Sequence, residues 1–262
     1  MTQNPLALKP LPLLACLLLA ACAGPDAASL QDGFKKYVAQ QPLESEAIAD
    51  RYLAANPNAP DIDQAYYLRG ISRMTRGNRA AAASDLRLAL TKTTRADLRS
   101  KAHRALGDMA YDQQQWPDAL KSYQAALDNL TLDPASVTYL NYRMGATLQC
   151  QGDWTRATDW FAKVVAARND PTLTDPALRR MHATSFSIQF GAFQDVAGAQ
   201  ALAGKLRTAN IVPIITNEPR TDARNQAQIW YLVQSGSFPT WTEALIARDR
   251  ARTKFPAAII VP

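Results

Sequence analysis

The sequence predicts a chain built from two kinds of structure, an all-α array of paired helices followed by a small α+β domain. Two internal repeats support this fold class. Gly70 recurs as Gly107 and Gly145 at intervals of 37 and 38 residues, whereas Gln189 recurs as Gln234 after 45 residues. Such periods are typical of repeated supersecondary units. The length of 262 residues also exceeds that of a usual single domain.

Residues 1–21 have the pattern of a bacterial export signal. Lys9 and the terminal amine give a weakly positive start, and the apolar stretch Leu11–Ala21 is shorter than the roughly 20 residues that a bilayer crossing needs. The run Leu19–Cys22 resembles a lipobox, which implies that Cys22 is lipidated and begins the mature chain. In the sorting pattern of such lipoproteins, alanine at position 23 favours the outer membrane. An ordinary signal peptide with an incidental cysteine is the alternative.

The cysteines agree with this interpretation. Cys16 would leave with the signal and Cys22 would carry lipid, so Cys150 would remain as a lone thiol without an intramolecular disulfide. Because Cys150 lies in an apolar helical pattern, we expect a small packed side chain rather than a nucleophile.

Residues 22–32 read as a short tether, and residues 33–168 read as helix pairs. Each repeated glycine is followed twelve residues later by alanine (Ala82, Ala119 and Ala157) and four residues further by a large side chain (Leu86, Tyr123 and Phe161). Further repeated positions are Gly77 and Gly152 before the second helix and Trp116 and Trp154 at its start. This spacing resembles the tetratricopeptide repeat, whose small residues let antiparallel helices approach closely. A degenerate leading unit is predicted over Gly33–Pro60.

Repeats of this kind imply a peptide or protein partner on the face formed by the first helix of each pair. The candidate contact residues there are Tyr66, Arg69, Arg73, His103, Asp108, Tyr142 and Arg143. Taken singly, each also fits an ordinary solvated surface. His103 has no cluster of cysteine, histidine or carboxylate side chains around it in the sequence, so no metal site is predicted.

Residues 169–183 read as a linker or a capping helix over Pro176–His182, and residues 184–262 as the α+β domain. In its first strand, Phe186, Ile188 and Phe190 alternate with Ser187 and Gln189, which is the period of two that a strand requires. In the strand of the second copy, Ile229, Tyr231 and Val233 alternate in the same way with Trp230, Leu232 and Gln234.

Amphipathic helices are predicted after each of these strands, over Val196–Asn210 and Thr240–Phe255, with Thr240 as the N-cap. Short β-branched strands over Val212–Thr216 and Ala257–Val261 complete each half. The resulting βαββαβ order is the ferredoxin-like arrangement. Both helices would cover one face of the sheet and leave the other face open.

This segment resembles the SPOR (sporulation-related repeat) domain, through the runs Ile188–Phe193 and Val233–Phe238 and through Trp230. The resemblance implies a peptidoglycan-binding module that favours glycan strands stripped of stem peptides, as found at the division septum. The positions it assigns to the glycan are Gln189, Ala192, Trp230, Leu232 and Gln234. An indole suits the C–H face of a sugar and side-chain amides suit its polar edge. Ala192 and Leu232 depart from the serine and the basic residue found in other members.

Other classes of function find little support in the sequence. The net charge of +6 is scattered without a dense basic run, so nucleic acid is not an expected partner. Motifs of serine hydrolases, zinc proteases and phosphate-binding loops are absent from the sequence, and no enzyme activity or cofactor is predicted.

Two non-enzymatic hypotheses follow. In the first, the protein is an outer-membrane lipoprotein on the periplasmic side that binds septal glycan through its C-terminal domain and recruits a protein partner through its helical repeats, in cell division or envelope organisation. In the second, the helical array is an envelope assembly scaffold and the C-terminal domain only localises it.

Overall fold

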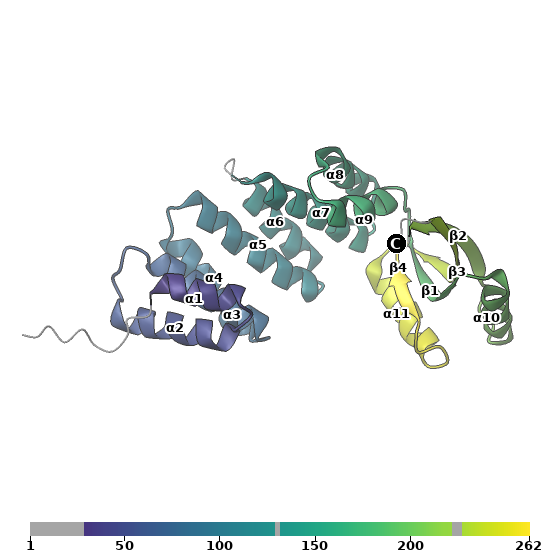
Figure 1. The fold of residues 1–262 in the computed structure, drawn as a ribbon, viewed down its shortest axis with the longest axis horizontal. Helices are drawn as coiled ribbons and strands as arrows, with labels where there is room; N and C mark the ends of the chain where they lie inside the picture. The colour runs from purple at the N-terminus through teal and green to yellow at the C-terminus, as the bar shows by residue number, and fades with distance from the viewer. Residues whose placement is uncertain (1–28, 129–131, 222–226) are drawn as a thin grey trace, which may run out of the picture.

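The computed structural model describes residues 29–128, 132–221 and 227–262 (Figure 1), so the predicted export signal, the tether up to residue 28 and Cys22 lie outside the described residues. The helices of the array are α1 (Leu30–Val38), α2 (Pro42–Ala55), α3 (Ile62–Thr75), α4 (Arg79–Lys92), α5 (Ala96–Asp112), α6 (Trp116–Leu127), α7 (Pro134–Cys150), α8 (Trp154–Ala167) and α9 (Pro171–Met181). The C-terminal elements are β1 (Phe186–Phe193), α10 (Val196–Thr208), β2 (Ile214–Thr221), β3 (Ala227–Phe238), α11 (Trp241–Arg252) and β4 (Ile259–Val261). The predicted fold class, a helical-repeat array followed by a ferredoxin-like unit, is confirmed.

Helices α1 to α8 form antiparallel pairs, and each pair turns on one residue in the left-handed region. These residues are Gln40, Gly77, Gln114 and Gly152, with φ of 58°, 79°, 59° and 87°. Each is followed by the N-cap residue of the second helix. The glycines expected at this turn are therefore present in two pairs, while glutamine adopts the same conformation in the other two.

The repeated glycine of each first helix makes room for the repeated large residue of its second helix. A Cβ placed on Gly107 would lie 2.6 Å from the ring of Tyr123, and one on Gly145 would lie 3.0 Å from the ring of Phe161. Both rings are fully buried. The helices of a pair can approach this closely only because the glycine has no side chain, which is the physical basis of the period seen in the sequence.

The turn residues give a first testable prediction. Gln114 pays a steric cost that glycine would not, because an L side chain crowds the backbone at positive φ. We expect Gln114→Gly to raise the free energy of unfolding by about 0.5–1 kcal/mol. Urea denaturation would measure the change. The matched control is Gly77→Ala, where no heavy atom lies within 4 Å of an added Cβ and only the backbone cost operates. Stabilisation by both substitutions would contradict the argument.

Helix α9 occupies most of the predicted linker and begins five residues before the predicted capping helix. Asp170 caps its first turn by accepting a hydrogen bond from the Thr172 backbone amide, 2.9 Å. Ala177 is buried against the last helix pair, and Pro176 lies inside the helix. The Arg180 backbone carbonyl accepts a hydrogen bond from Gln149 Nε2, 2.9 Å. The segment is therefore helical because it covers the apolar end of the array.

The C-terminal strands form an antiparallel sheet in the order β2-β3-β1-β4, with α10 and α11 packed against it. The buried core between sheet and helices contains Ile188, Phe190, Ala199, Ala203, Leu206, Val233 and Ala258. Thr240 caps α11 as predicted, since its hydroxyl oxygen accepts from the Glu243 amide. The alternation read from the sequence therefore assigned Ile188, Phe190 and Val233 to the core correctly, whereas Ile229, expected on the same face, is 55% exposed.

Strand β2 is longer than predicted and ends at Thr221 rather than Thr216. It pairs with β3 from Ile214 to Thr221, including Pro219 opposite Ile229. A proline has no backbone N–H to donate, but β2 is an edge strand whose outer side needs no partner. The proline is tolerated for this reason, and the strand continues past it.

Aromatic side chains join the helical array to the C-terminal domain. The Phe186 ring lies between Trp154 of α8 and Trp241 of α11, with centroid distances of 4.9 and 5.7 Å. Trp154 Nε1 donates a hydrogen bond to the Pro239 carbonyl oxygen, 2.8 Å. Buried Cys150 belongs to the same cluster. The C-terminal domain is therefore attached to the last helix pair through an apolar contact as well as through the chain. Figure 1 shows the domain at the α8–α9 end of the array.

Among the helices of the described residues, none combines the length and the hydropathy that a bilayer crossing requires.

Candidate functional site

The five positions assigned to glycan lie together on the sheet face opposite α10 and α11, which we call the open face. Gln189 pairs with Gln234, and Ala192 pairs with Leu232, across β1 and β3. Residues directly opposite in a ladder share a face, and so do residues two apart in one strand, which places Trp230 beside Leu232. Gln189, Ala192, Trp230 and Gln234 are all half-buried.

Trp230 is flanked by a charged pair from the edge strand. The Arg220 guanidinium carbon lies 5.2 Å from the indole centroid, a distance that permits a cation–π contact. Arg220 also pairs with Glu218, 2.7 Å, and Glu218 stands directly opposite Trp230 in the ladder. The guanidinium lies over the indole ring, so a ligand would stack on the rest of the ring surface and find directional hydrogen-bonding groups beside it.

Leu232 requires a correction. It is only 8% exposed, lying between Ala192 and Thr216 across the neighbouring strands and between Trp230 and Gln234 along its own. Its flanking side chains leave almost none of its surface for a ligand. Leu232 therefore forms the buried base of the open face, and the side chains around it provide the surface that a ligand would contact.

Sequence reasoning missed polar residues at one end of this face. The predicted contacts did not include four residues there, namely Glu218 and Arg220 on β2, Gln228 on β3 and Gln194 after β1. Gln194 Nε2 donates to Gln228 Oε1, 2.9 Å, which links the ends of β1 and β3. The signal was present, because Thr216, Glu218 and Arg220 continue the two-residue alternation of β2.

Arg69 and Arg73, predicted to contact a partner, are instead held in ion pairs within the array. Both reach Asp85 of α4, at 2.6 and 2.7 Å, and Asp85 is buried. Arg69 also pairs with Asp50 of α2, 2.9 Å, and Arg73 with Glu46, 2.9 Å. Burial would raise the pKa of Glu46, but hydrogen bonds from Arg73 and Arg76 hold it below the ordinary value. This charge network connects α2, α3 and α4, so Arg69 and Arg73 act in holding these helices together.

Asp108 and Arg143 are brought together in a second network. The Asp108 carboxylate accepts from the hydroxyls of Tyr123, 2.8 Å, and Tyr139, 2.7 Å, and lies 3.1 Å from Arg143 Nε. The Arg143 guanidinium carbon is also 3.9 Å from the Tyr111 ring centroid. Burial, reinforced by the Asp108 charge, raises the pKa of Tyr139 to about 12, so its hydroxyl stays protonated and donating.

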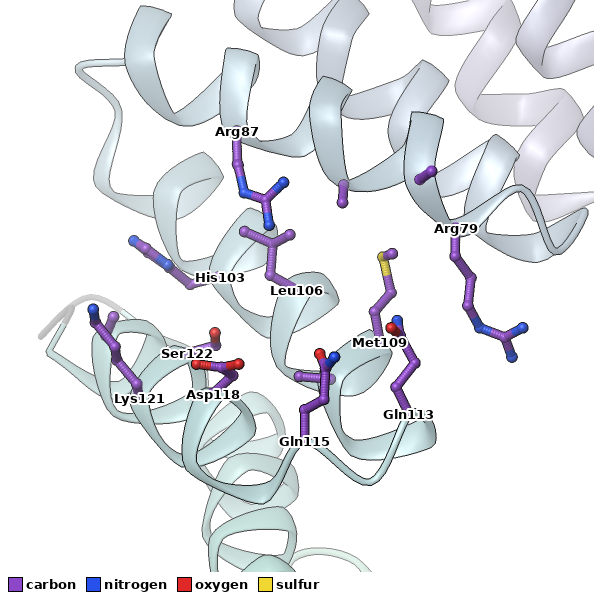
Figure 2. Close-up of a pocket in the computed structure, with 14 residues that line it drawn as sticks. Arg79, Arg87, His103, Leu106, Met109, Gln113, Gln115, Asp118, Lys121 and Ser122 are labelled. Carbon is purple, nitrogen blue, oxygen red and sulfur yellow. The ribbon is translucent and has the colours of Figure 1, made fainter.

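The remaining candidates lie apart from one another. Tyr66 borders the first network, with its ring 5.4 Å from the Arg69 guanidinium carbon. Tyr142 packs edge-on against Phe161, 5.6 Å between centroids. His103 faces a different surface, a groove bounded by α4, α5 and α6 that Figure 2 shows. The structure therefore does not gather the predicted partner-binding residues into one site.

The Cys150 thiol is a packed group. Burial raises the pKa of this thiol to about 11, and the side chain is buried against Phe186, so it matches the predicted packed side chain. Within the described ranges, no group of three or more histidine, cysteine, aspartate or glutamate side chains could hold a metal ion.

Comparison with protein families gives a match to each part of the chain. A family model described as the SPOR domain matches residues 183–262. A second model, YfiO, described as an outer membrane lipoprotein, matches residues 27–182. None of the curated proteins compared with the chain matches it.

Solved structures of other proteins resemble the helical array. PilF of Pseudomonas aeruginosa is 14% identical with a TM-score of 0.48, over 69% of this chain and 84% of that one. A MamA double mutant is 14% identical with a TM-score of 0.48, over 71% and 97%. A thermophilic TPR protein of Thermus thermophilus is 19% identical with a TM-score of 0.42, over 58% and 79%. Likenesses this distant carry no argument about function.

Proposed function

Because this chain belongs to the YfiO family of outer membrane lipoproteins and ends in a SPOR domain, we propose that it binds denuded septal glycan and recruits a protein partner. The families imply peptidoglycan binding and an outer membrane scaffold, and neither is catalytic. In the proposed arrangement, lipid on Cys22 holds the protein at the periplasmic face of the outer membrane. The open face binds the glycan and the helical array binds the partner, in cell division or envelope organisation.

The observation that carries the glycan proposal is the position of Trp230. Both helices of the domain pack on the other face, so no helix or strand of the described residues covers the indole and the amides of Gln189 and Gln234. Sugar rings stack on indoles through their C–H face, while amide groups donate and accept hydrogen bonds at the ring edge. Removal of the stem peptide leaves a carboxylate on each muramic acid, and Arg220 beside Trp230 is a suitable partner for it.

This proposal predicts a loss of binding without a loss of stability. We expect Trp230→Ala to weaken binding to amidase-treated sacculi roughly tenfold or more, since an aromatic anchor at the centre of a site typically contributes at least that much. Gln189→Ala should weaken it less. The unfolding temperature of both variants should stay near that of the wild type. Co-sedimentation with sacculi and circular dichroism would measure the two quantities.

Gln200→Ala is the matched control, because Gln200 is an exposed amide on α10, away from the open face. It should bind as the wild type does. Unchanged sedimentation of Trp230→Ala would overturn the assignment of the open face. Equal binding to untreated and amidase-treated sacculi would remove the preference for denuded strands. Release of soluble muropeptides by the purified protein would show hydrolysis, which neither hypothesis includes.

The alternative function, an assembly scaffold that the SPOR domain only localises, has one structural observation in its favour. The aromatic contact of Trp154, Phe186 and Trp241 attaches the sheet to the end of the array. A module that localises the array would need such an attachment, because it has to carry the array with it to the septum. If partner capture were complete with Trp230→Ala in cells while septal position was lost, the scaffold function would be the main one.

A further inference from the structure

The helical array has a groove on the side of its second helices. It lies between α4 and α6, has α5 as its floor and encloses about 660 Å³ (Figure 2). The neighbouring helices α4 and α6 belong to successive pairs, so the groove lies between two repeats. It is separate from the open face of the sheet and from the two charge networks.

The floor of this groove is apolar. Leu106 and Met109 of α5 point into it, and small side chains of the flanking helices complete it, namely Ala80, Ala83 and Ala125. Leu106 is half-buried and supplies accessible surface to the floor, whereas Met109 is only 4% exposed and belongs mainly to the core of the array. A groove of this kind accepts apolar side chains from another molecule and removes them from water.

The rim of the groove is positively charged. Arg79 and Arg87 rise from α4 and Lys121 from α6, while Asp118 is the carboxylate that lines the same groove. Burial, followed by the nearby charge of Arg99, holds the pKa of His103 below its ordinary value, which favours the neutral ring. The rim therefore carries three cations against one carboxylate.

These three cations differ from the arginines of α3 in their ion pairing. Within the described part of the chain, none of Arg79, Arg87 and Lys121 forms an ion pair with a carboxylate. In contrast, Arg69 and Arg73 of the preceding helix are fully engaged with carboxylates. Unpaired cations around an apolar floor are complementary to a molecule that carries both carboxylates and apolar groups.

We propose that the groove formed by α4, α5 and α6 binds an acidic protein segment, whose apolar side chains cover Leu106 and the flanking alanines and whose carboxylates pair with Arg79, Arg87 and Lys121. The inference rests on the proposed function in one respect, namely that the array recruits a protein, and it assigns the surface and the chemistry of that partner. A glycan lacks the apolar side chains that the floor would bury. A membrane surface is too flat to enter a concave groove between helices.

A labelled peptide composed of glutamate and leucine at helical spacing is the probe, titrated against the full-length lipoprotein in neutral detergent. We expect saturable binding that weakens when ionic strength rises from about 0.05 to about 0.5 M, because the rim is exposed to salt. A glutamate–serine peptide should bind roughly tenfold more weakly, since it cannot bury apolar surface. A lysine–leucine peptide should not bind.

Charge reversal identifies the site. Arg87→Glu and Lys121→Glu should each weaken binding of the glutamate–leucine peptide roughly tenfold, as loss of a close charge pair at an interface does. Arg51→Glu is the control, because Arg51 is an exposed arginine on α2 outside the groove, and it should bind normally. Circular dichroism would show that all three variants keep the helical fold.

Equal peptide affinity in Arg87→Glu, Lys121→Glu and the wild type would overturn the proposal. Equal binding of the glutamate–leucine and glutamate–serine peptides would also overturn it, because the groove would then act only as a charged surface. Displacement of the peptide by anionic lipid added to the detergent micelles, with this displacement lost in Arg87→Glu, would replace the protein partner with a membrane. Sacculus binding should be unchanged in every groove variant, so failure of the glycan proposal would be seen separately.

Discussion

Asp85→Ala is expected to destabilise the helical array by about 3–5 kcal/mol, because removing one member of a buried ion-pair network leaves the other charges without compensation. The Asp85 side chain is 3% exposed, and it accepts from Arg69 and Arg73, whose side chains are 18% and 20% exposed. Asp50 and Glu46 would still pair with these arginines, but both belong to α2, so the ion pairs to α4 would be lost. Urea denaturation followed by far-ultraviolet circular dichroism would measure the change.

The control for this prediction is Asp97→Ala. Asp97 pairs with Arg95 at 2.9 Å, but the two side chains are 45% and 49% exposed, so solvent screens the interaction. Its removal should cost no more than about 1 kcal/mol. Similar effects at both positions would show that the Asp85 network is a surface feature. Asp85→Asn, which keeps the shape and loses the charge, should resemble Asp85→Ala.

Phe190→Ala is expected to destabilise the C-terminal domain by about 3–5 kcal/mol through the cavity that it leaves. Phe190 is 7% exposed, belongs to the core between sheet and helices, and packs edge-on against Phe255 with centroids 5.5 Å apart. The side chain therefore contacts both the sheet and the segment after α11. Equilibrium unfolding of the full chain, followed by tryptophan fluorescence, would measure the loss.

Trp230→Ala serves as the comparison, because both residues are large aromatics of the same sheet on opposite faces. We expect opposite results from them, with Phe190→Ala losing stability and Trp230→Ala losing glycan binding. Under conditions in which Phe190→Ala is still folded, it should sediment with amidase-treated sacculi. A loss of stability in Trp230→Ala equal to that in Phe190→Ala would show that the indole belongs to the core.

The helical part was predictable where its residues pack against close neighbours along the chain. Gly107 and Tyr123 belong to one pair, and their fixed separation reports the closest approach of the two helices. The turns were half predictable. Gly77 and Gly152 revealed the left-handed position, whereas Gln40 and Gln114 adopt it without a sequence signal. At Gln40 and Gln114, packing of the flanking helices imposes the positive φ, and glutamine tolerates it.

The predicted partner residues show what the repeat pattern does not contain. Position along a helix indicates which side chains lie on the same helix face. Which other helix packs against that face depends on how successive helix pairs stack. Arg69 and Arg73 were expected on a partner-binding face and instead meet Asp85 and Asp50 from two other helices. The groove around His103 was likewise not predicted, because its walls come from different pairs.

The sequence by itself determined the order of elements and most of the facing of β1 and β3, because these depend on local periods of two and of about 3.6 residues. The family resemblance was also visible in the sequence, through the motif residues of the two repeats. Only the tertiary structure decided that Leu232 lies under its neighbours, that Arg220 reaches Trp230 and that Trp154 holds the sheet to the array. The physical reason is that burial, ion pairing and stacking depend on residues far apart in the chain, whose distances are set when the strands and helices pack together.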